Sequence, residues 1–149
     1  SGLEVISSMS RFGRVLMSLA IAVYTFIPPA VDLITDSHVF DADWMPHARM
    51  HTVWLLGVTS GVGLIALYLL WSSGENGRFR TNLAGLLSAV VFGAFYLSAS
   101  TISLYGGSLS DMSGGVGKGP FGIDVNLFTF TAATAVLAVG WIFSVRSRT

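Results

Sequence analysis

The sequence predicts an all-α integral membrane protein, an up-and-down bundle of four transmembrane helices in a single domain that covers residues 1–149. The first observation is composition: 52% of the residues are hydrophobic and only 11% are charged, whereas soluble domains carry about 25% charged residues. A chain this short can bury only part of so much apolar surface in one core, so much of it must face lipid. The second observation is that four segments approach or exceed the roughly 20 apolar residues that a helix needs to cross a bilayer.

The first two predicted spans are residues 15–31 and 50–71, and neither contains an Asp, Glu, Lys or Arg. The second span is preceded by signals for the start of a helix. Asp43 is suited to be its N-cap, and Pro46 fits the first turn, where the missing N–H of proline costs no hydrogen bond. We therefore expect the second helix to begin a few residues before the apolar run.

The third and fourth predicted spans are residues 83–105 and 125–145, and they also lack charged residues. Small residues recur in the second and third spans, where they allow helix backbones to approach closely in a membrane. We expect them to pack inside the bundle rather than against a second copy of the chain. These residues are Gly57, Gly61, Gly85, Ser88, Ala89 and Gly93.

The basic residues predict the orientation of the bundle. With four spans, six arginines fall on one side of the membrane, which the positive-inside rule makes cytoplasmic, together with both termini. The other side holds all three histidines and six of the eight acidic residues. The six arginines are Arg11, Arg14, Arg78, Arg80, Arg146 and Arg148.

The stretch DADWMPHARMH, residues 41–51, gathers ionisable side chains immediately before the second span. His47 and His51 are four residues apart and share one helical face, from which Arg49 points away. Such a pair can exchange protons near neutral pH, or chelate a divalent metal with a carboxylate such as Asp36. A third interpretation is that the histidines only bond to loop carboxylates while Arg49 and Trp44 anchor the helix at the interface.

The expected topology brings the start of the fourth span to the same side of the membrane. We therefore predict one pocket there, lined by His47, Arg49, His51, Asp124 and Asn126. Aromatic side chains could contact a flat lipophilic ligand in this pocket. The aromatic residues we predict to do so are Trp44, Trp54 and Tyr105.

The leading functional hypothesis is that the site binds a small lipophilic molecule from the bilayer and converts it by acid–base chemistry. His47 or His51 would be the general acid or base, Asp43 or Asp124 would orient it, and Arg49 would hold a negative charge. Without a nucleophile or cofactor motif, isomerisation, cyclisation or hydration suits these groups best, and no cofactor is predicted.

Two alternatives come from other classes of function. The first is a non-catalytic subunit of a larger membrane complex or a homo-oligomer, which would pack through the small-residue faces. The second is a divalent-metal protein with His47, His51 and Asp36 as ligands. Nucleic acid is not an expected partner because no basic patch with interleaved aromatics is present. The absence of cysteine excludes disulfides and thiolate metal sites.

The W-x-x-H-A-R-x-H string, formed by Trp44, His47, Ala48, Arg49 and His51, resembles a motif of small, uncharacterised bacterial four-helix inner-membrane proteins. The similarity covers about a dozen residues and the four-span layout. It implies a multi-pass protein of the bacterial inner membrane and carries over no activity.

Overall fold

The structure, a computed structural model, describes residues 2–35, 38–73, 75–109 and 119–146, and the side chains of these residues from Arg11 onward. Its elements are all helices. They are α1 (Gly2–Ile34), α2 (Pro46–Trp71), α3 (Gly77–Ser100), α4 (Ile102–Tyr105), the 3₁₀ helix η1 (Pro120–Gly122) and α5 (Val125–Arg146).

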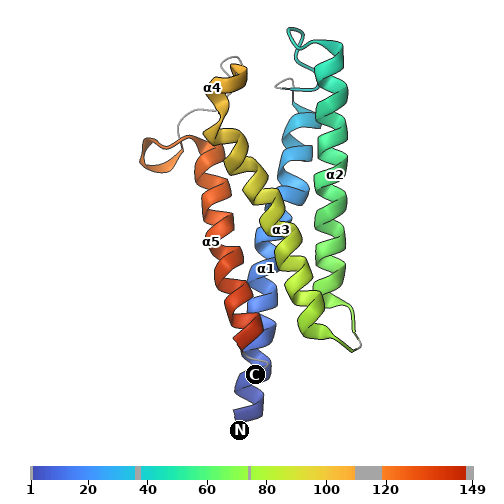
Figure 1. Cartoon of the computed structure of the whole chain (residues 1–149), viewed down its shortest axis with the longest axis vertical. Coiled ribbons are helices and arrows are strands. Elements are labelled where there is room, and N and C mark those ends of the chain that lie inside the picture. The colour runs from blue at the N-terminus through green and yellow to red at the C-terminus, as the bar shows by residue number, and fades with distance from the viewer. Residues whose placement is uncertain (1, 36–37, 74, 110–118, 147–149) are drawn as a thin grey trace.

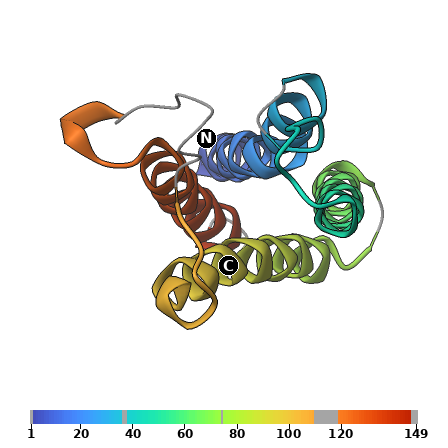
Figure 2. The same ribbon diagram turned by 90° about the horizontal axis from the view of Figure 1, so that it is seen from above.

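The four long helices run alternately up and down, as the sequence predicts (Figure 1). Each packs against the next along the chain, and α5 closes the ring by packing extensively on α1. Seen from above, the four helices surround a common centre (Figure 2). The ends of α1 and α5 that are nearest the termini lie at one end of the bundle, here called the basic end. The link from α1 to α2, α4 and η1 lie at the opposite end, here called the loop end.

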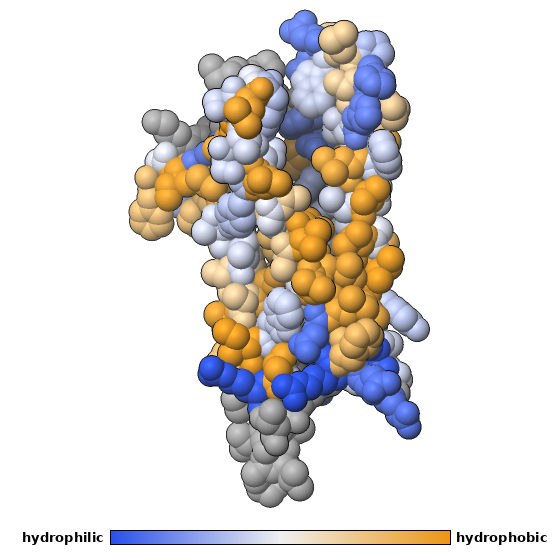
Figure 3. Space-filling model, viewed as in Figure 1, coloured by the Kyte–Doolittle hydropathy of each residue, from blue (hydrophilic) through white to orange (hydrophobic). Residues whose placement is uncertain are grey.

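Four of the described helices are long and apolar enough to cross a membrane, with mean hydropathies of 1.7 to 2.0 over their most apolar windows. Only 22 to 28% of the residues in these windows are buried inside the bundle. The remaining apolar surface requires an apolar surrounding medium. Figure 3 shows hydrophobic residues over the middle of the molecule and hydrophilic residues gathered toward both ends. The chain therefore has the form of a multi-pass membrane protein.

The third span ends earlier than predicted. Instead of continuing to residue 105, α3 stops at Ser100, and Thr101 leaves the helical region with φ −111° and ψ 12°. Ser100 Oγ and Thr101 Oγ1 both donate to the Leu97 carbonyl, at 2.9 and 2.8 Å. Such side-chain bonds compete with the regular helical pattern. The short helix α4 follows and ends at Tyr105, and its C-cap is Gly106, whose φ of 68° suits a glycine.

The prediction that Asp43 caps α2 is wrong. The N-cap is Met45, which makes no side-chain cap bond, and Pro46 occupies the first turn as expected. A residue before proline is pushed into extended backbone, and Met45 has φ −62° and ψ 138°. This sets the helix boundary two residues after Asp43, whose amide instead donates to Asp41 Oδ1 at 2.8 Å.

The core is built from a few close inter-helix contacts. Tyr24 packs edge-on against Phe92, with ring centroids 5.4 Å apart, and its hydroxyl lies 3.1 Å from Ser88 Oγ. The expectation of intra-bundle packing is confirmed for Gly85, where an added Cβ would lie 2.5 Å from the Trp141 ring. It is not confirmed for three other glycines, which face open space within 4 Å: Gly57, Gly61 and Gly93.

Candidate functional site

A cleft of about 720 Å³ opens in the loop half of the bundle, between α1, α3 and α5. We call it the loop-end cleft. The molecule is visibly hollowed between α4 and α2 at this end (Figure 3). Most of the wall is apolar, and the stacked rings of Phe95 and Phe130, 4.3 Å apart, form part of it. The apolar lining is completed by Val23, Ile27, Pro28, Val31, Leu109 and Val125.

The polar part of the lining centres on a contact between a histidine and a carboxylate. His38 Nδ1 lies 3.1 Å from Asp32 Oδ1, and the two side chains are 31% and 17% exposed. Trp44 meets the His38 ring edge-on at 5.2 Å. Asp32 is in the last turn of α1, whereas His38 and Trp44 belong to the link that follows. The cleft therefore joins an apolar wall to a titratable pair.

Arg49 holds the link that carries His38 and Trp44. Its guanidinium donates to the carbonyls of Asp41 and Trp44, at 2.5 and 3.1 Å, and also to that of Ala42. Because Arg49 is fixed on α2, these bonds tie the link to the helix. Arg49 therefore positions a segment of the cleft. The sequence analysis had instead predicted that Arg49 stabilises a negative charge on the ligand.

The start of α5 forms the opposite wall. Asp124 Oδ1 accepts from the amides of Asn126 and Leu127 at 2.9 and 3.1 Å, which is N-capping geometry. Asn126 Nδ2 donates to the Leu109 carbonyl at 2.9 Å and so ties the segment after α4 to α5. Asn126, Ser108 and Thr129 contribute the remaining polar lining of the cleft.

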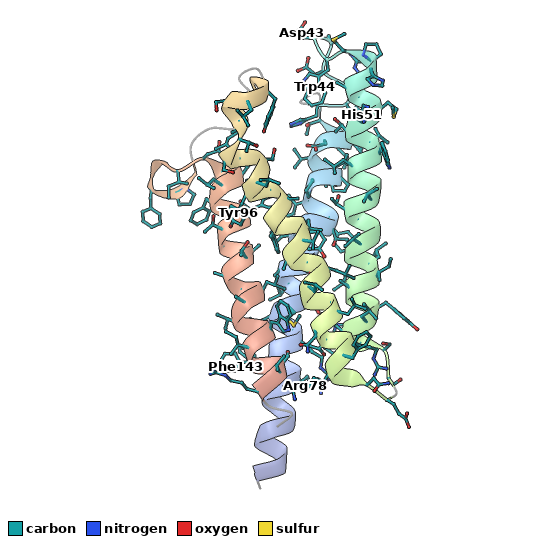
Figure 4. The ribbon with its side chains drawn as sticks, viewed as in Figure 1. Asp43, Trp44, His51, Arg78, Tyr96 and Phe143 are labelled. Carbon is teal, nitrogen blue, oxygen red and sulfur yellow. The ribbon has the colours of Figure 1, made fainter. Side chains whose placement is uncertain are left out.

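His47 and His51 form a separate pair on an exposed face of α2. Their Nε2 atoms are 3.0 Å apart, and their rings are nearly perpendicular. The ring of Trp54 lies 5.8 Å from that of His51. Trp44 and His51 are both at the loop end, whereas Arg78 is at the basic end (Figure 4).

The structure separates residues that the sequence prediction placed around one pocket. Trp44 and Asn126 line the loop-end cleft, but His47, His51 and Trp54 are not among its described lining residues. The reason is helical phase: the buried face of α2 is defined by Leu56, Gly63, Ala66 and Leu70, and both histidines lie on the exposed side of the helix, away from it. Of the other predicted residues, Asp43 and Tyr105 are exposed, Tyr105 bonds to Ser98, Asp124 caps α5, and Asp36 lies outside the described residues.

Sequence reasoning missed Asp32 and His38 as site residues. The signal was present, since Asp32 directly follows the apolar run of the first span and His38 comes six residues later. A carboxylate at the end of a span is expensive unless it faces the interior or finds a partner. That argument points to Asp32, although it does not identify His38 as the partner.

Within the described part of the chain, no group of three or more His, Asp or Glu side chains is placed to hold a metal ion. The two histidines of α2, whose Nε2 atoms are 3.0 Å apart, could supply two metal ligands, with water completing the coordination. Comparison with protein-family models, with curated proteins and with solved structures finds no match to this chain.

Proposed function

We propose that this protein binds a small lipophilic molecule in the loop-end cleft. The observation that carries the proposal is the cleft itself, about 720 Å³ with a mostly apolar wall and a few convergent polar groups. Ligand pockets typically measure about 300 to 1,000 Å³ and have this kind of lining. The surrounding apolar helices support entry of the molecule from a bilayer.

The polar groups suggest how the ligand would be oriented. Its apolar body would lie against Phe95 and Phe130, and its polar end would reach the His38–Asp32 pair or the Asn126 amide. If the ligand is also converted, acid–base chemistry such as isomerisation, cyclisation or hydration would fall to His38, with Asp32 orienting its ring. This moves the proposed chemistry from His47 and His51 to a different histidine.

We further propose that the basic end faces the cytoplasm of a bacterial cell and the cleft faces the periplasm. Arginines of α1, α3 and α5 gather at the basic end, and the positive-inside rule assigns such an end to the cytoplasm. The motif resemblance supports a location in the bacterial inner membrane, and the charge asymmetry supports this orientation in it.

Photoaffinity labelling tests the proposal directly. The purified protein in nanodiscs would be irradiated with a medium-chain fatty alcohol that carries an alkyl diazirine, and the labelled peptides would be identified by mass spectrometry. We expect saturable labelling of the cleft segments, residues 23–32 and 125–130. Thr129→Trp, which places an indole in the cleft, should abolish that labelling.

Val58→Trp is the matched control because Val58 is exposed on α2 and lies outside the cleft lining. It should leave cleft labelling unchanged. His38→Ala should weaken binding of the alcohol roughly threefold to tenfold, as expected for a hydrogen bond of about 1 kcal/mol. Non-saturable labelling that is equal in the wild type and Thr129→Trp would refute the proposal.

A second candidate function is divalent-metal binding at His47 and His51. The specific observation is the 3.0 Å separation of their Nε2 atoms on an exposed helical turn. Two imidazole nitrogens that each bind a metal at about 2.0–2.1 Å in tetrahedral geometry come to nearly this separation. The pair is thus already close to a chelating arrangement.

A further inference from the structure

The loop-end cleft has a one-sided charge. Its described lining contains one carboxylate, that of Asp32, and neither an arginine nor a lysine. Arg49 binds the link from α2 and does not belong to this lining. Lys118 lies outside the described residues. The charge of the described lining therefore depends on Asp32 and on whether His38 is protonated.

Asp32 lies where a carboxylate is electrostatically unfavourable. It is in the last turn of α1, which contains no basic residue. The carbonyl end of a helix bears a partial negative charge, so it repels an anion and attracts a cation. The side chain is also only 17% exposed, and burial away from water adds to the cost of its charge. A cation bound beside Asp32 would offset both effects.

His38 satisfies this carboxylate only in part. Its Nδ1 lies 3.1 Å from Asp32 Oδ1. A neutral imidazole donates one hydrogen bond there and leaves the negative charge in place. Because a carboxylate accepts several hydrogen bonds through its two oxygens, Asp32 can contact His38 and a ligand at the same time. The ligand group that meets Asp32 should therefore be a hydrogen-bond donor, and a positively charged donor suits it best.

The opposite wall of the cleft offers little to an anion. The start of a helix attracts anions through its amides, but at α5 the amides of Asn126 and Leu127 already donate to Asp124 Oδ1. Asn126 Nδ2 donates to the Leu109 carbonyl at 2.9 Å, so this side chain can offer its oxygen to a donor on the ligand. Both walls thus favour a ligand that donates hydrogen bonds.

Aromatic rings add to the preference for a cation. Trp44, Phe95 and Phe130 belong to the lining, and the Trp44 ring is 5.2 Å from the His38 ring that contacts Asp32. The face of an aromatic ring is negative, so it attracts an ammonium group and repels a carboxylate. A carboxylate with an aromatic ring nearby matches the chemistry of an alkylammonium group.

We propose that the loop-end cleft prefers a lipophilic amine, whose protonated nitrogen binds Asp32 and whose apolar body lies against the wall formed by Phe95 and Phe130. This inference rests on the proposed function, because it names the class of ligand that the cleft takes. Lipophilic alcohols should bind more weakly, since they bring no charge of their own. Fatty acids should bind most weakly, because their carboxylate would face that of Asp32.

Competition against the diazirine alcohol tests this preference. The protein in nanodiscs of zwitterionic lipid would be labelled at neutral pH in the presence of an alkyl amine, an alcohol or a fatty acid of the same chain length. The concentration of each competitor in the bilayer would be measured, so that differences in partitioning are removed. We expect the amine to block labelling of the cleft segments at a concentration at least about tenfold lower than the alcohol, and the fatty acid to compete least.

Asp32→Asn is the decisive variant, because it keeps the size of the side chain and an oxygen for His38 but removes the charge. In this variant the amine and the alcohol should compete about equally. Asp43→Asn is the matched control, since Asp43 is exposed at the same end of the bundle and does not line the cleft (Figure 4). It should keep the preference for the amine. Saturable labelling by the alcohol shows that the cleft is intact in each variant.

The outcomes separate this inference from the proposed function. Saturable labelling of the wild type that all three compounds block equally, or that the fatty acid blocks best, would overturn the preference for amines and leave the proposed function standing. Loss of the preference in Asp43→Asn as well as in Asp32→Asn would also overturn it, because general surface charge would then explain the effect. Non-saturable labelling of the wild type would refute the proposed function and this inference together.

Discussion

Arg49 connects the chemistry of single residues to the shape of the loop-end cleft. Its bonds to backbone carbonyls of the link fix the segment from which His38 and Trp44 reach the cleft. A guanidinium that satisfies several carbonyls at once does for an irregular segment what a ladder of backbone bonds does for a helix. The polar edge of the cleft therefore depends on a residue that does not line it.

At the residue scale, we expect the His47–His51 pair to bind a divalent metal, and the fluorescence of the neighbouring Trp54 should report this binding. Adding Cu²⁺ should quench the Trp54 fluorescence, because the metal would sit beside a ring that is 5.8 Å from Trp54. His51→Ala should lose this quenching, whereas His38→Ala should keep it. Acidification should reverse it, since imidazole binds metals only in its neutral form. Quenching that persists in His51→Ala would disprove the site.

At the scale of elements, the contact between α1 and α5 is set by two glycines. A Cβ added at Gly140 would lie 2.7 Å from the Gly13 carbonyl oxygen and 2.8 Å from Leu16 Cβ. Backbone atoms cannot move aside as a flexible side chain can, so any larger residue must push the helices apart. In a bilayer, such close contact is a main source of helix association.

Gly140→Leu should therefore lower the free energy of unfolding by about 1–3 kcal/mol, the usual cost of overpacking. Gly57→Leu is the matched control, because nothing lies within 4 Å of a Cβ added there. Unfolding in mixed detergent micelles, followed by circular dichroism, measures both variants. Equal destabilisation of the two variants would contradict this prediction. It would indicate instead that another copy of the chain packs against Gly57, as in a homo-oligomer formed through α2.

At the scale of the whole molecule, the two ends of the bundle carry different chemistry. The basic end has the described arginines of α1, α3 and α5, and the loop end has the described histidines and most of the described acids. An even number of spans puts the ends of α1 and α5 on the same side of a membrane. The loop-end cleft and the arginines of the basic end would then face different compartments.

Single-cysteine variants test this arrangement cleanly, because the chain contains no cysteine of its own. Glu75→Cys and Asp43→Cys place exposed thiols at opposite ends of the bundle. In intact bacterial spheroplasts, a membrane-impermeant maleimide should label Asp43→Cys, and it should label Glu75→Cys only after the membrane is opened. The reverse pattern would overturn the proposed orientation, and labelling of both in intact cells would overturn the four-span topology.

The number and order of the spans could be predicted from the sequence because each depends on the local density of apolar residues. The end of α3 could not, since the run of apolar and small residues continues past Ser100. The end of α3 coincides with the hydroxyl groups of Ser100 and Thr101, which donate hydrogen bonds to the Leu97 carbonyl. Asp43 was predicted as a cap from its residue type, but the position of Pro46 moved the boundary to Met45.

The sequence by itself determined that the protein is a four-span helical bundle with most of its cations and most of its acids at opposite ends, because hydropathy and charge act locally along the chain. Only the tertiary structure decided which polar residues meet. The phase of α2 turned His47 and His51 outward, and the convergence of α1, α3 and α5 brought Asp32, His38 and Asn126 to one cleft. Such contacts depend on where helices from distant parts of the sequence cross, and no local pattern specifies that.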